Sequence, residues 1–374
     1  MNEDMLLEVK NLRTYFYLDE GVVKAVDGAS FSVQRGKTLA VVGESGCGKS
    51  ITARSILQIV SRPGKIIDGE ILFHRHTPDA NGGSRTETFT ITDHKPNSPE
   101  MRQFRGKDVA MIFQEPMASL SPVHTIGNQV MENFRQHFKT SKQEARDVTV
   151  EMLRKVGIAK PEQRFDAYPH QLSGGMRQRA MIAMALICQP SLLIADEPTT
   201  ALDVTTQAQI LELMIQLQQE LEMAIIIITH DLGVVAEIAD DVAVMYLGEV
   251  VERAPVDELF HDPKHPYTQG LMSSIPKIEG QTRERLETIP GSVPHPYNRP
   301  TGCRFNPRCR ARIENKLGIC KHHEPELLPL TNQHDVRCWL YHKPTGVDYQ
   351  AISNDELLQD DEAASLAATP NVTK

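Results

Sequence analysis

The sequence predicts an α/β domain whose core is a mostly parallel β-sheet. Three short, continuous apolar runs, at Thr38–Val42, Ser191–Ala195 and Ala224–Thr229, are typical of strands that are buried on both faces. Between the second and the third run, Thr206–Leu221 repeats apolar residues at spacings of three and four, which indicates a helix. Strands that alternate with helices along a chain form a mostly parallel sheet covered by helices.

The remaining elements follow from local patterns. Further strands are expected at Leu6–Val9, Ala29–Val33, Asp108–Gln114 and Asp241–Tyr246. A helix is expected from about Lys49 to Val60, and residues 126–160 are expected to be mainly helical. The polar, turn-rich residues 74–98 are interpreted as an extended loop or a β-excursion at the surface. Prolines become frequent after residue 263, which places a domain boundary near residues 260–285.

The composition disfavours two classes of protein. The net charge of −9 argues against a general nucleic-acid binder, although part of it comes from an acidic tail at residues 346–374 that we expect to be disordered. No stretch reaches the roughly 18 consecutive apolar residues of a membrane-spanning helix. The first ten residues are acidic and lack the pattern of a secretory signal. We therefore expect a cytoplasmic protein that reaches any membrane through its partners.

A glycine-rich loop follows the first buried strand and precedes a helix. Residues 43–50 (GESGCGKS) fit the pattern GxxxxGKS, in which glycines allow backbone N–H groups to surround phosphate oxygens. Lys49 can reach the β- and γ-phosphates of a nucleotide, and the Ser50 hydroxyl can ligate Mg²⁺. The predicted nucleotide contacts are Gly43, Ser45, Gly46, Cys47, Gly48, Lys49, Ser50 and Ile51. Lys49 and the helix N-terminus could lower the pKa of the Cys47 thiol, but a small, tolerated side chain is the simpler interpretation.

Two acidic residues follow the second buried strand. Asp196 and Glu197 stand at its carboxyl end, where ligands bind in open α/β sheets. Asp196 can bind Mg²⁺ directly or through water, which leaves Glu197 free to orient and deprotonate an attacking water. A second helix start rich in small residues, Leu172–Met176 (LSGGM), also offers free N–H groups to an anion. The sequence therefore predicts binding and hydrolysis of MgATP.

Across residues 6–260 the chain resembles the ATP-binding-cassette (ABC) ATPases. Its motifs stand in the order of that family: phosphate loop, Gln114, LSGGM, Asp196-Glu197-Pro198, Ala201-Leu202-Asp203 and His230. The resemblance implies a P-loop nucleotide-binding domain over residues 1–260, with an antiparallel β-subdomain and a helical subdomain at about 115–180. The family usually has Gln at the position of Met176. Because that position chiefly starts the helix, we expect little loss from the difference.

The same resemblance implies that two such domains pair head to tail around ATP. Four residues would face the other subunit or its nucleotide: Ser173, Gly174, Gly175 and Asp203. Gln114 would contact Mg²⁺ and the γ-phosphate and would link the site to a membrane partner, while His230 would contact the γ-phosphate. Phe16 matches the position of an aromatic residue that stacks on adenine, with Tyr15 as the neighbouring alternative.

Four of the six cysteines gather near the end of the sequence. They are Cys303, Cys309, Cys320 and Cys338, separated by five, ten and seventeen residues. Four thiolates can complete a tetrahedral Zn²⁺ site or bind a 4Fe-4S cluster. The spacing lacks the tight CxxC of common zinc ribbons and fits a larger cluster somewhat better, but it leaves both metals open. His322 and His323 are alternative ligands, and unrelated thiols are the simplest interpretation.

The C-terminal part resembles one ABC branch in particular, the oligopeptide and dipeptide importer ATPases. The matching phrases are Gln114–Pro122, His265–Pro276, Ile289–Pro294 and Gly302–Cys309. That branch implies a C-terminal extension at residues 261–345 that carries a 4Fe-4S cluster on the four cysteines. It also implies a second, related ABC ATPase subunit (or a second copy of this chain), two membrane permease subunits and, indirectly, a substrate-binding protein. The chain would lie at the cytoplasmic face of the inner or plasma membrane.

The leading hypothesis is therefore an ATPase that energises import of peptides. Relatives in this branch also carry oligosaccharides or nickel, and the ATPase does not touch the substrate. A soluble ABC ATPase that acts on nucleic acid or ribosomes is disfavoured by the single cassette and by the absence of sustained heptads between Ser50 and Ser173. An iron–sulfur electron carrier is disfavoured by the complete catalytic set, including Glu197 and His230.

Overall fold

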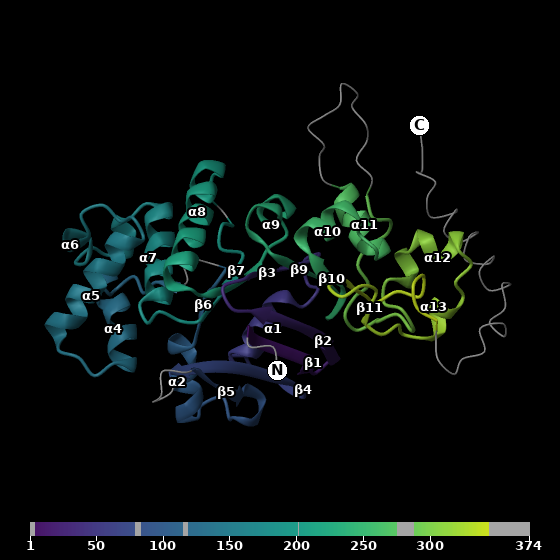
Figure 1. The fold of residues 1–374 in the computed structure, drawn as a ribbon, viewed down its shortest axis with the longest axis horizontal. Helices are drawn as coiled ribbons and strands as arrows, with labels where there is room; N and C mark the ends of the chain where they lie inside the picture. Colours follow the sequence, from purple (N-terminus) through teal and green to yellow (C-terminus); the bar gives the residue numbers. More distant parts are fainter. Residues whose placement is uncertain (1–3, 79–83, 115–118, 201, 275–287, 344–374) are drawn as a thin grey trace, which may run out of the picture.

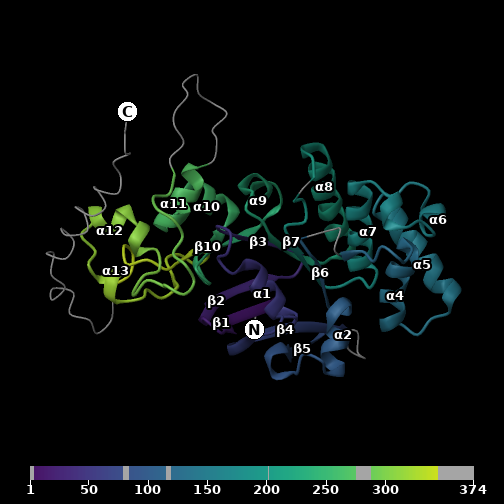
Figure 2. The ribbon, with the colours of Figure 1, turned by 180° about the vertical axis from the view of Figure 1, so that it is seen from behind.

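The chain folds around two β-sheets, with a lobe of helices at one end and the C-terminal residues at the other (Figures 1 and 2). The computed structural model describes residues 4–78, 84–114, 119–200, 202–274 and 288–343. Across these ranges, the larger sheet has eight strands in the order β11-β12-β10-β9-β3-β8-β7-β6, and the smaller has four in the order β2-β1-β4-β5.

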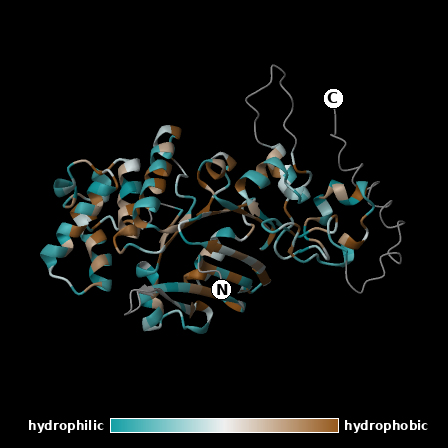
Figure 3. Ribbon diagram, viewed as in Figure 1, coloured by the Kyte–Doolittle hydropathy of each residue, from teal (hydrophilic) through white to brown (hydrophobic). Residues whose placement is uncertain are grey.

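The centre of the larger sheet is parallel, as the sequence predicts. Strands β3 (Thr38–Val42), β7 (Leu192–Asp196) and β8 (Ala224–Ile228) are buried along their whole length. They pair in parallel with each other and with β6 (Val109–Ile112) and β9 (Asp241–Tyr246). Hydrophobic residues concentrate on these strands (Figure 3). Because these five strands run parallel, their carboxyl ends lie along one edge of the sheet.

The smaller sheet is antiparallel and larger than its sequence pattern predicts. The expected strands at Leu6–Val9 and Ala29–Val33 are parts of β1 (Met5–Leu18) and β2 (Gly21–Gln34). Of the two interpretations of residues 74–98, the β-excursion is correct for most of the segment. It contains the end of β4 (Gly64–Pro78), β5 (Ser84–Thr90) and the short η1 (Ile91–Asp93). Residues 79–83 of this segment lie outside the described ranges.

Helices pack on the central sheet and form the lobe beside it. The first, α1 (Lys49–Ile56), ends earlier than expected because Gln58 adopts a positive φ of 50° and its N–H donates to the Ser55 carbonyl. The other helices of this part are α2 (Pro99–Lys107), α4 (Ile126–His137), α5 (Lys142–Lys155), α6 (Pro161–Arg164), η2 (Pro169–Gln171), α7 (Gly174–Leu186), α8 (Val204–Leu221) and α9 (Leu232–Ile238). The start of α5 is fixed by a capping box between Ser141 and Glu144.

The last part of the chain joins the central sheet instead of standing apart from it. Strand β10 (Glu249–Pro255) pairs with β9 on one side and with β12 (Asp335–Val336) on the other, and β12 pairs with β11 (Leu328–Pro329). The short helices of this part are α10 (Val256–His261), α11 (Pro266–Ser273), η3 (Asn306–Arg308), α12 (Arg310–Glu314) and α13 (Ile319–His322). We call residues 288–343 the C-terminal segment. Its two strands extend the edge of the sheet.

In the part of the chain that the structure describes, no helix is both long enough and apolar enough to cross a membrane. The expected tail at residues 346–374 lies outside the described ranges.

Candidate nucleotide site

The glycine-rich loop lies between β3 and α1, at the carboxyl edge of the parallel strands. The Lys49 ammonium group donates hydrogen bonds to the carbonyl oxygens of Gly43 (2.7 Å) and Glu44 (3.1 Å). These contacts place the ammonium group inside the curve of the loop, where the loop's N–H groups can meet phosphate oxygens. Ser45 and Gly46 are exposed at its tip.

Two of the loop's glycines are required by close backbone contacts. A Cβ on Gly43 would lie 2.2 Å from the Met245 carbonyl oxygen, and one on Gly48 would lie 2.4 Å from the Ala25 carbonyl oxygen. Both glycines also have positive φ, at 147° and 106°. The loop therefore fits closely between the end of β9 and strand β2.

Cys47 is buried within the loop and is not a reactive thiol in this arrangement. Its side chain is 1% exposed, and its sulfur lies 3.6 Å from the Lys49 ammonium nitrogen. Burial raises the pKa of Cys47, and the opposing effect of Lys49 is smaller. The suggestion that Lys49 and the helix lower this pKa is therefore wrong.

Ser50 and Asp196 meet where the predicted Mg²⁺ would bind. The Ser50 hydroxyl donates to one Asp196 carboxylate oxygen at 2.9 Å. Asp196 is 1% exposed at the end of β7, and burial raises its pKa while the Ser50 hydrogen bond lowers it. A hydroxyl and a carboxylate at this separation are the oxygen ligands that Mg²⁺ prefers. Residues 50 and 196 are 146 apart in sequence, so the fold creates this pair.

Glu197 is the residue on which the predicted catalytic side chains converge. The Gln114 side-chain amide donates to one carboxylate oxygen at 3.0 Å, and His230 Nδ1 lies 3.4 Å from the other. The Glu197 backbone has a positive φ of 48°, and its N–H donates to the Ile228 carbonyl at the end of β8. This uncommon conformation stands at the point where the chain leaves β7.

Thr200 is a member of this group that sequence reasoning missed. Its hydroxyl donates to Glu197 at 3.0 Å. The acidic pair Asp196-Glu197 is recognisable by its place after a buried strand, whereas a threonine three residues later carries no comparable signal.

The LSGGM segment starts helix α7 in the helical lobe. Ser173 is its N-cap, and its hydroxyl accepts a hydrogen bond from the Met176 N–H at 3.3 Å. No atom would lie within 4 Å of a Cβ on Gly174, whereas a Cβ on Gly175 would meet Thr206 at 3.0 Å. In Figures 1 and 2, α7 lies well to the side of α1. The segment is therefore an open helix start away from the chain's own phosphate loop.

The remaining predicted site residues lie in simpler surroundings. Asp203 is the N-cap of α8 and accepts from the Thr206 N–H at 3.0 Å. Ile51 is half-buried against the core beneath α1. Ala201, which precedes Asp203 in its motif, lies outside the described ranges, as does Glu115–Ala118 in the phrase after Gln114.

The structure does not bring the two candidate adenine aromatics to one position. The half-buried Phe16 pairs with Gly64 across the smaller sheet, and its ring is 2.7 Å from where a Cβ on Gly64 would lie. The Tyr15 hydroxyl instead donates to Asp27 at 2.7 Å. The stacking role of Phe16 stays a prediction.

The four C-terminal cysteines lie in one segment but do not form the expected metal site. All are free, and the Cys303 N–H donates to the Cys320 carbonyl at 2.8 Å. Cys303 and Cys320 pack in an apolar cluster with Leu317 and neighbouring residues. Within the described ranges, no three or more His, Cys, Asp or Glu side chains are arranged so that they could bind a metal ion.

Burial raises the pKa of each of these thiols, to about 12 for Cys320 and Cys338. Neighbouring thiols add to the rise. The pKa of Cys303 is raised further by Cys320 and Cys338, and that of Cys320 by Cys309 and Cys338. The thiols are therefore near enough to affect one another's charge, without a metal-binding geometry.

Four features of this site together define an ABC-type ATPase. They are the phosphate loop, the Ser50–Asp196 pair, the Glu197 carboxylate contacted by Gln114 and His230, and the second capped helix start. The family model described as ABC transporter matches residues 26–200. The model described as oligopeptide/dipeptide transporter, C-terminal region, matches residues 251–315. Together with the relatives below, these matches show that the chain belongs to the ATP-binding proteins of the oligopeptide/dipeptide branch of the ABC transporter family.

The relatives match over nearly their whole length. The oligopeptide transport ATP-binding protein AppD of Bacillus subtilis (strain 168) is 52% identical over 337 residues, which are 90% of this chain and 97% of that protein. The dipeptide transport ATP-binding protein DppD of Haemophilus influenzae is 45% identical over 347 residues, 92% of this chain and 99% of that protein.

Solved structures share the fold of about two thirds of the chain. CbiO1 from Clostridium perfringens, part of the transporter complex CbiONQ, has a TM-score of 0.54 at 29% identity, covering 70% of this chain and 92% of its own. The dimeric cassette MJ0796, bound to ADP and Pi after hydrolysis, has a TM-score of 0.56 at 24% identity, covering 67% of this chain and 99% of its own. The second likeness concerns the fold alone.

Proposed function

We propose that this chain is the ATP-hydrolysing subunit that energises import of peptides through a membrane ABC transporter. The observation that carries the proposal is the convergence of Gln114 and His230 on the Glu197 carboxylate, directly beside the Ser50–Asp196 pair. The choice of peptides rests on the relatives, which are named for oligopeptide and dipeptide transport.

Each residue has one task in the proposed reaction. The loop N–H groups and Lys49 bind the phosphates, and Ser50 and Asp196 would hold Mg²⁺, which supplies charge neutralisation on the phosphate oxygens. Glu197 accepts a proton from the attacking water, since its carboxylate faces the same edge of the sheet. Gln114 and His230 orient that carboxylate. We assign both to the γ-phosphate side of the site.

The site is completed by a second ATPase subunit. We assign Ser173, Gly174 and Gly175 to the nucleotide of the opposite subunit, because they form an open, capped helix start that lies apart from the chain's own phosphate loop. A helix N-terminus with unpaired N–H groups favours an anion such as the γ-phosphate. Asp203, exposed at the start of α8, is assigned to the contact between the subunits.

A substitution of Glu197 tests the reaction. Glu197→Gln keeps the side-chain shape and its contacts but cannot accept a proton, so we expect ATP binding to persist and turnover to fall by about 10²–10⁴-fold. ATP affinity and phosphate release are measured on the same preparation. Glu212→Gln makes the same chemical change at an exposed position of α8 and is the matched control, for which we expect the wild-type rate. Phosphate release at the wild-type rate in Glu197→Gln would remove Glu197 as the base.

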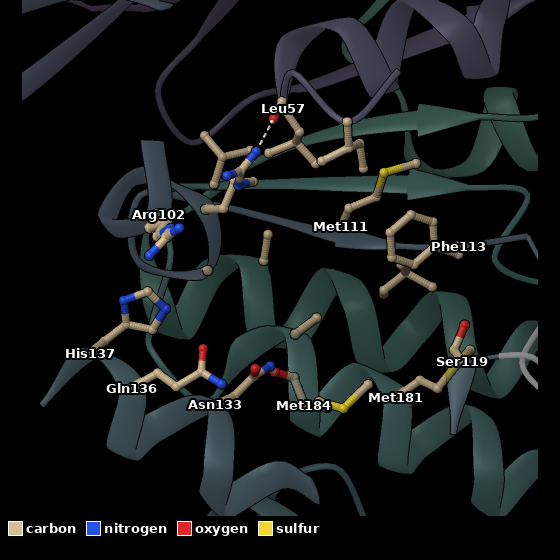
Figure 4. A pocket seen from close by; sticks show the side chains of 17 residues that line it. Leu57, Arg102, Met111, Phe113, Ser119, Asn133, Gln136, His137, Met181 and Met184 are labelled. Atoms are coloured by element: carbon tan, nitrogen blue, oxygen red, sulfur yellow. Dashed lines mark hydrogen bonds between the residues drawn. The ribbon is translucent and has the colours of Figure 1, made fainter. Parts of the chain in front are cut away.

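A groove between α7 and the central sheet is proposed as the docking surface for a permease subunit (Figure 4). It has a volume of about 460 Å³, and its apolar lining includes Met111, Phe113, Met181 and Met184. Polar side chains, among them Arg102, Asn133 and His137, line the rest of it. Phe113 is 41% exposed and immediately precedes Gln114. A permease element in this groove would therefore contact the residue next to the one that reaches Glu197. The chain would then lie peripherally at the cytoplasmic face of the membrane.

The docking surface can be tested without touching the nucleotide site. Met184→Arg places a charge in the groove, so we expect it to reduce co-purification with the permeases while ATP binding stays at the wild-type level. Gln143→Arg, on α5, is the control. Co-purification of Met184→Arg at the wild-type level would exclude this groove.

We further propose that Cys303, Cys309, Cys320 and Cys338 bind a 4Fe-4S cluster, with Zn²⁺ as the alternative. The support is that the four cysteines are free, lie in one segment and raise one another's thiol pKa. Within the described ranges, their side chains are not arranged as a metal site. Anaerobic purification followed by iron, sulfide and zinc analysis separates the outcomes. Iron and sulfide in equal amounts support the cluster, and stoichiometric zinc supports the alternative. A protein that contains neither iron nor zinc would exclude both proposals.

A further inference from the structure

The C-terminal segment reaches the phosphate loop through one buried arginine. The Arg308 guanidinium donates two hydrogen bonds to the Glu44 carboxylate, from Nη1 to Oε2 at 2.7 Å and from Nη2 to Oε1 at 3.1 Å. Glu44 is the second residue of the loop, and Arg308 lies 264 residues later in the chain. Two parallel hydrogen bonds between charged groups fix both distance and orientation.

The arginine is itself held in place. Its side chain is 5% exposed, its Nε donates to the Pro290 carbonyl at 2.9 Å, and its guanidinium lies 5.9 Å from the centre of the Tyr246 ring and 6.0 Å from that of Phe305. A guanidinium whose position is fixed by such contacts loses little entropy on forming the ion pair. Arg308 therefore restrains the position of the Glu44 carboxylate more than Glu44 restrains Arg308.

The loop is contacted at two further points by residues outside its own motif. The Tyr267 hydroxyl, on α11, accepts a hydrogen bond from the Glu44 N–H at 2.8 Å. At the other end of the loop, the Gly248 N–H donates to the Cys47 carbonyl at 2.9 Å, and Arg304 of the C-terminal segment donates to the adjacent Leu247 carbonyl at 2.8 Å. Both ends of the loop thus depend on residues outside the phosphate-loop motif.

We propose that Arg308 is a positioning residue for ATP binding, acting through Glu44. The inference rests on the proposed role of residues 43–50 as the phosphate loop. Arg308 does two things: it fixes the start of the loop, and it pairs with a carboxylate that would otherwise stand unpaired beside a multiply negative ligand. An unpaired negative charge beside a phosphate site lowers the affinity for phosphate because like charges repel.

The two effects of Arg308 can be separated by neutralising Glu44. We expect Arg308→Ala to raise the dissociation constant for ATP about tenfold, which corresponds to about 1.4 kcal/mol. The double variant Arg308→Ala/Glu44→Gln removes the unpaired carboxylate. We therefore expect it to recover at least half of the loss of ATP affinity, measured on a logarithmic scale. ATP affinity is measured on the full chain by displacement of a fluorescent ATP analogue, with thermal unfolding recorded for each variant.

Two controls make the outcomes distinct. Arg310→Ala removes an exposed arginine two residues along, and we expect the wild-type ATP affinity. Lys49→Ala tests the phosphate loop itself: if it binds ATP as the wild type does, the proposed nucleotide site is wrong. If Lys49→Ala loses affinity while Arg308→Ala does not, only the role of Arg308 is wrong. If Glu44→Gln gives no recovery in the double variant, Arg308 has a structural role only and the inference is overturned.

Discussion

Ser50 and Asp196 show how the fold prepares a cation site before any cation binds. The 2.9 Å hydrogen bond between them holds two oxygen ligands side by side, and burial of Asp196 raises its pKa. A divalent cation would replace the hydroxyl proton as the partner of the carboxylate and would favour its charged form. The pair is therefore expected to set the requirement for Mg²⁺ more than the affinity for the nucleotide.

Ser50→Ala tests this at the scale of one hydroxyl group. The variant loses one oxygen ligand and leaves the loop glycines and Lys49 in place, so we expect half-maximal ATPase activity to need about tenfold more Mg²⁺, a change of about 1.4 kcal/mol. The affinity for ATP without Mg²⁺ should differ from the wild-type value by no more than about twofold. A change of that size is no larger than an ordinary surface substitution causes in free energy. The measurement is a Mg²⁺ titration of phosphate release. An unchanged titration curve would remove Ser50 from the cation site.

A local pattern marks several of the candidate site residues in the sequence. Asp196 and Glu197 directly follow a buried strand, and Lys49 and Ser50 begin a helix after a glycine loop, so their neighbours along the chain reveal their places. Arg308 carries no such mark. It meets Glu44 only because the C-terminal segment packs against the carboxyl edge of the sheet, and no periodicity relates residues that far apart.

At the scale of elements, the edge of the central sheet depends on a buried ion pair. Strand β12 is only two residues long, and beside it His334 Nε2 lies 2.7 Å from Glu252 Oε1 of β10. Both side chains are almost completely buried. Two backbone pairs cannot fix a strand by themselves, so this contact is expected to carry much of the attachment of the C-terminal segment. Neither the two-residue strands nor this contact has a sequence signal, so the sequence predicts a C-terminal extension but not its place at the edge of the sheet.

The ion pair predicts a pH-dependent stability. The hydrogen bond to Glu252 raises the pKa of His334 above its ordinary 6.5, and burial opposes the rise less strongly. Because the folded-state pKa is the higher one, the stabilisation is fully present below pH 6.5 and is lost as the pH rises through the folded-state pKa. We expect His334→Gln to cost about 1.5–3 kcal/mol at pH 6 and clearly less at pH 9.

Urea denaturation of the wild type and the variant at both pH values measures the difference. His323→Gln, at an exposed histidine of the same segment, is the control. A cost that is equal at pH 6 and pH 9 would mean that His334 acts through its shape and not through its charge.

At the scale of the whole molecule, the two helix starts that we propose to bind phosphate belong to different halves. The phosphate loop begins α1 over the central sheet, and Ser173 begins α7 in the helical lobe. Because one chain carries both halves of the site in separate places, a head-to-tail pair of cassettes would complete two sites at once. The motifs predict both halves, whereas their separation becomes visible only when the helical lobe is placed beside the sheet.

This arrangement predicts that trapping ATP also traps the pair of subunits. In the Glu197→Gln background we expect MgATP to be bound but not hydrolysed. It should then shift the chain, mixed with the proposed second cassette subunit or with its own copies, from monomer to dimer in sedimentation. Adding Ser173→Arg places a bulky side chain where the γ-phosphate of the opposite site would lie, so the dimer should be lost while each monomer still binds ATP. Gln143→Arg, at an exposed position of α5 in the same lobe, should leave the dimer intact. A dimer that survives Ser173→Arg would show that the LSGGM segment is not the opposite wall of the site, and hydrolysis would then have to be explained within one chain.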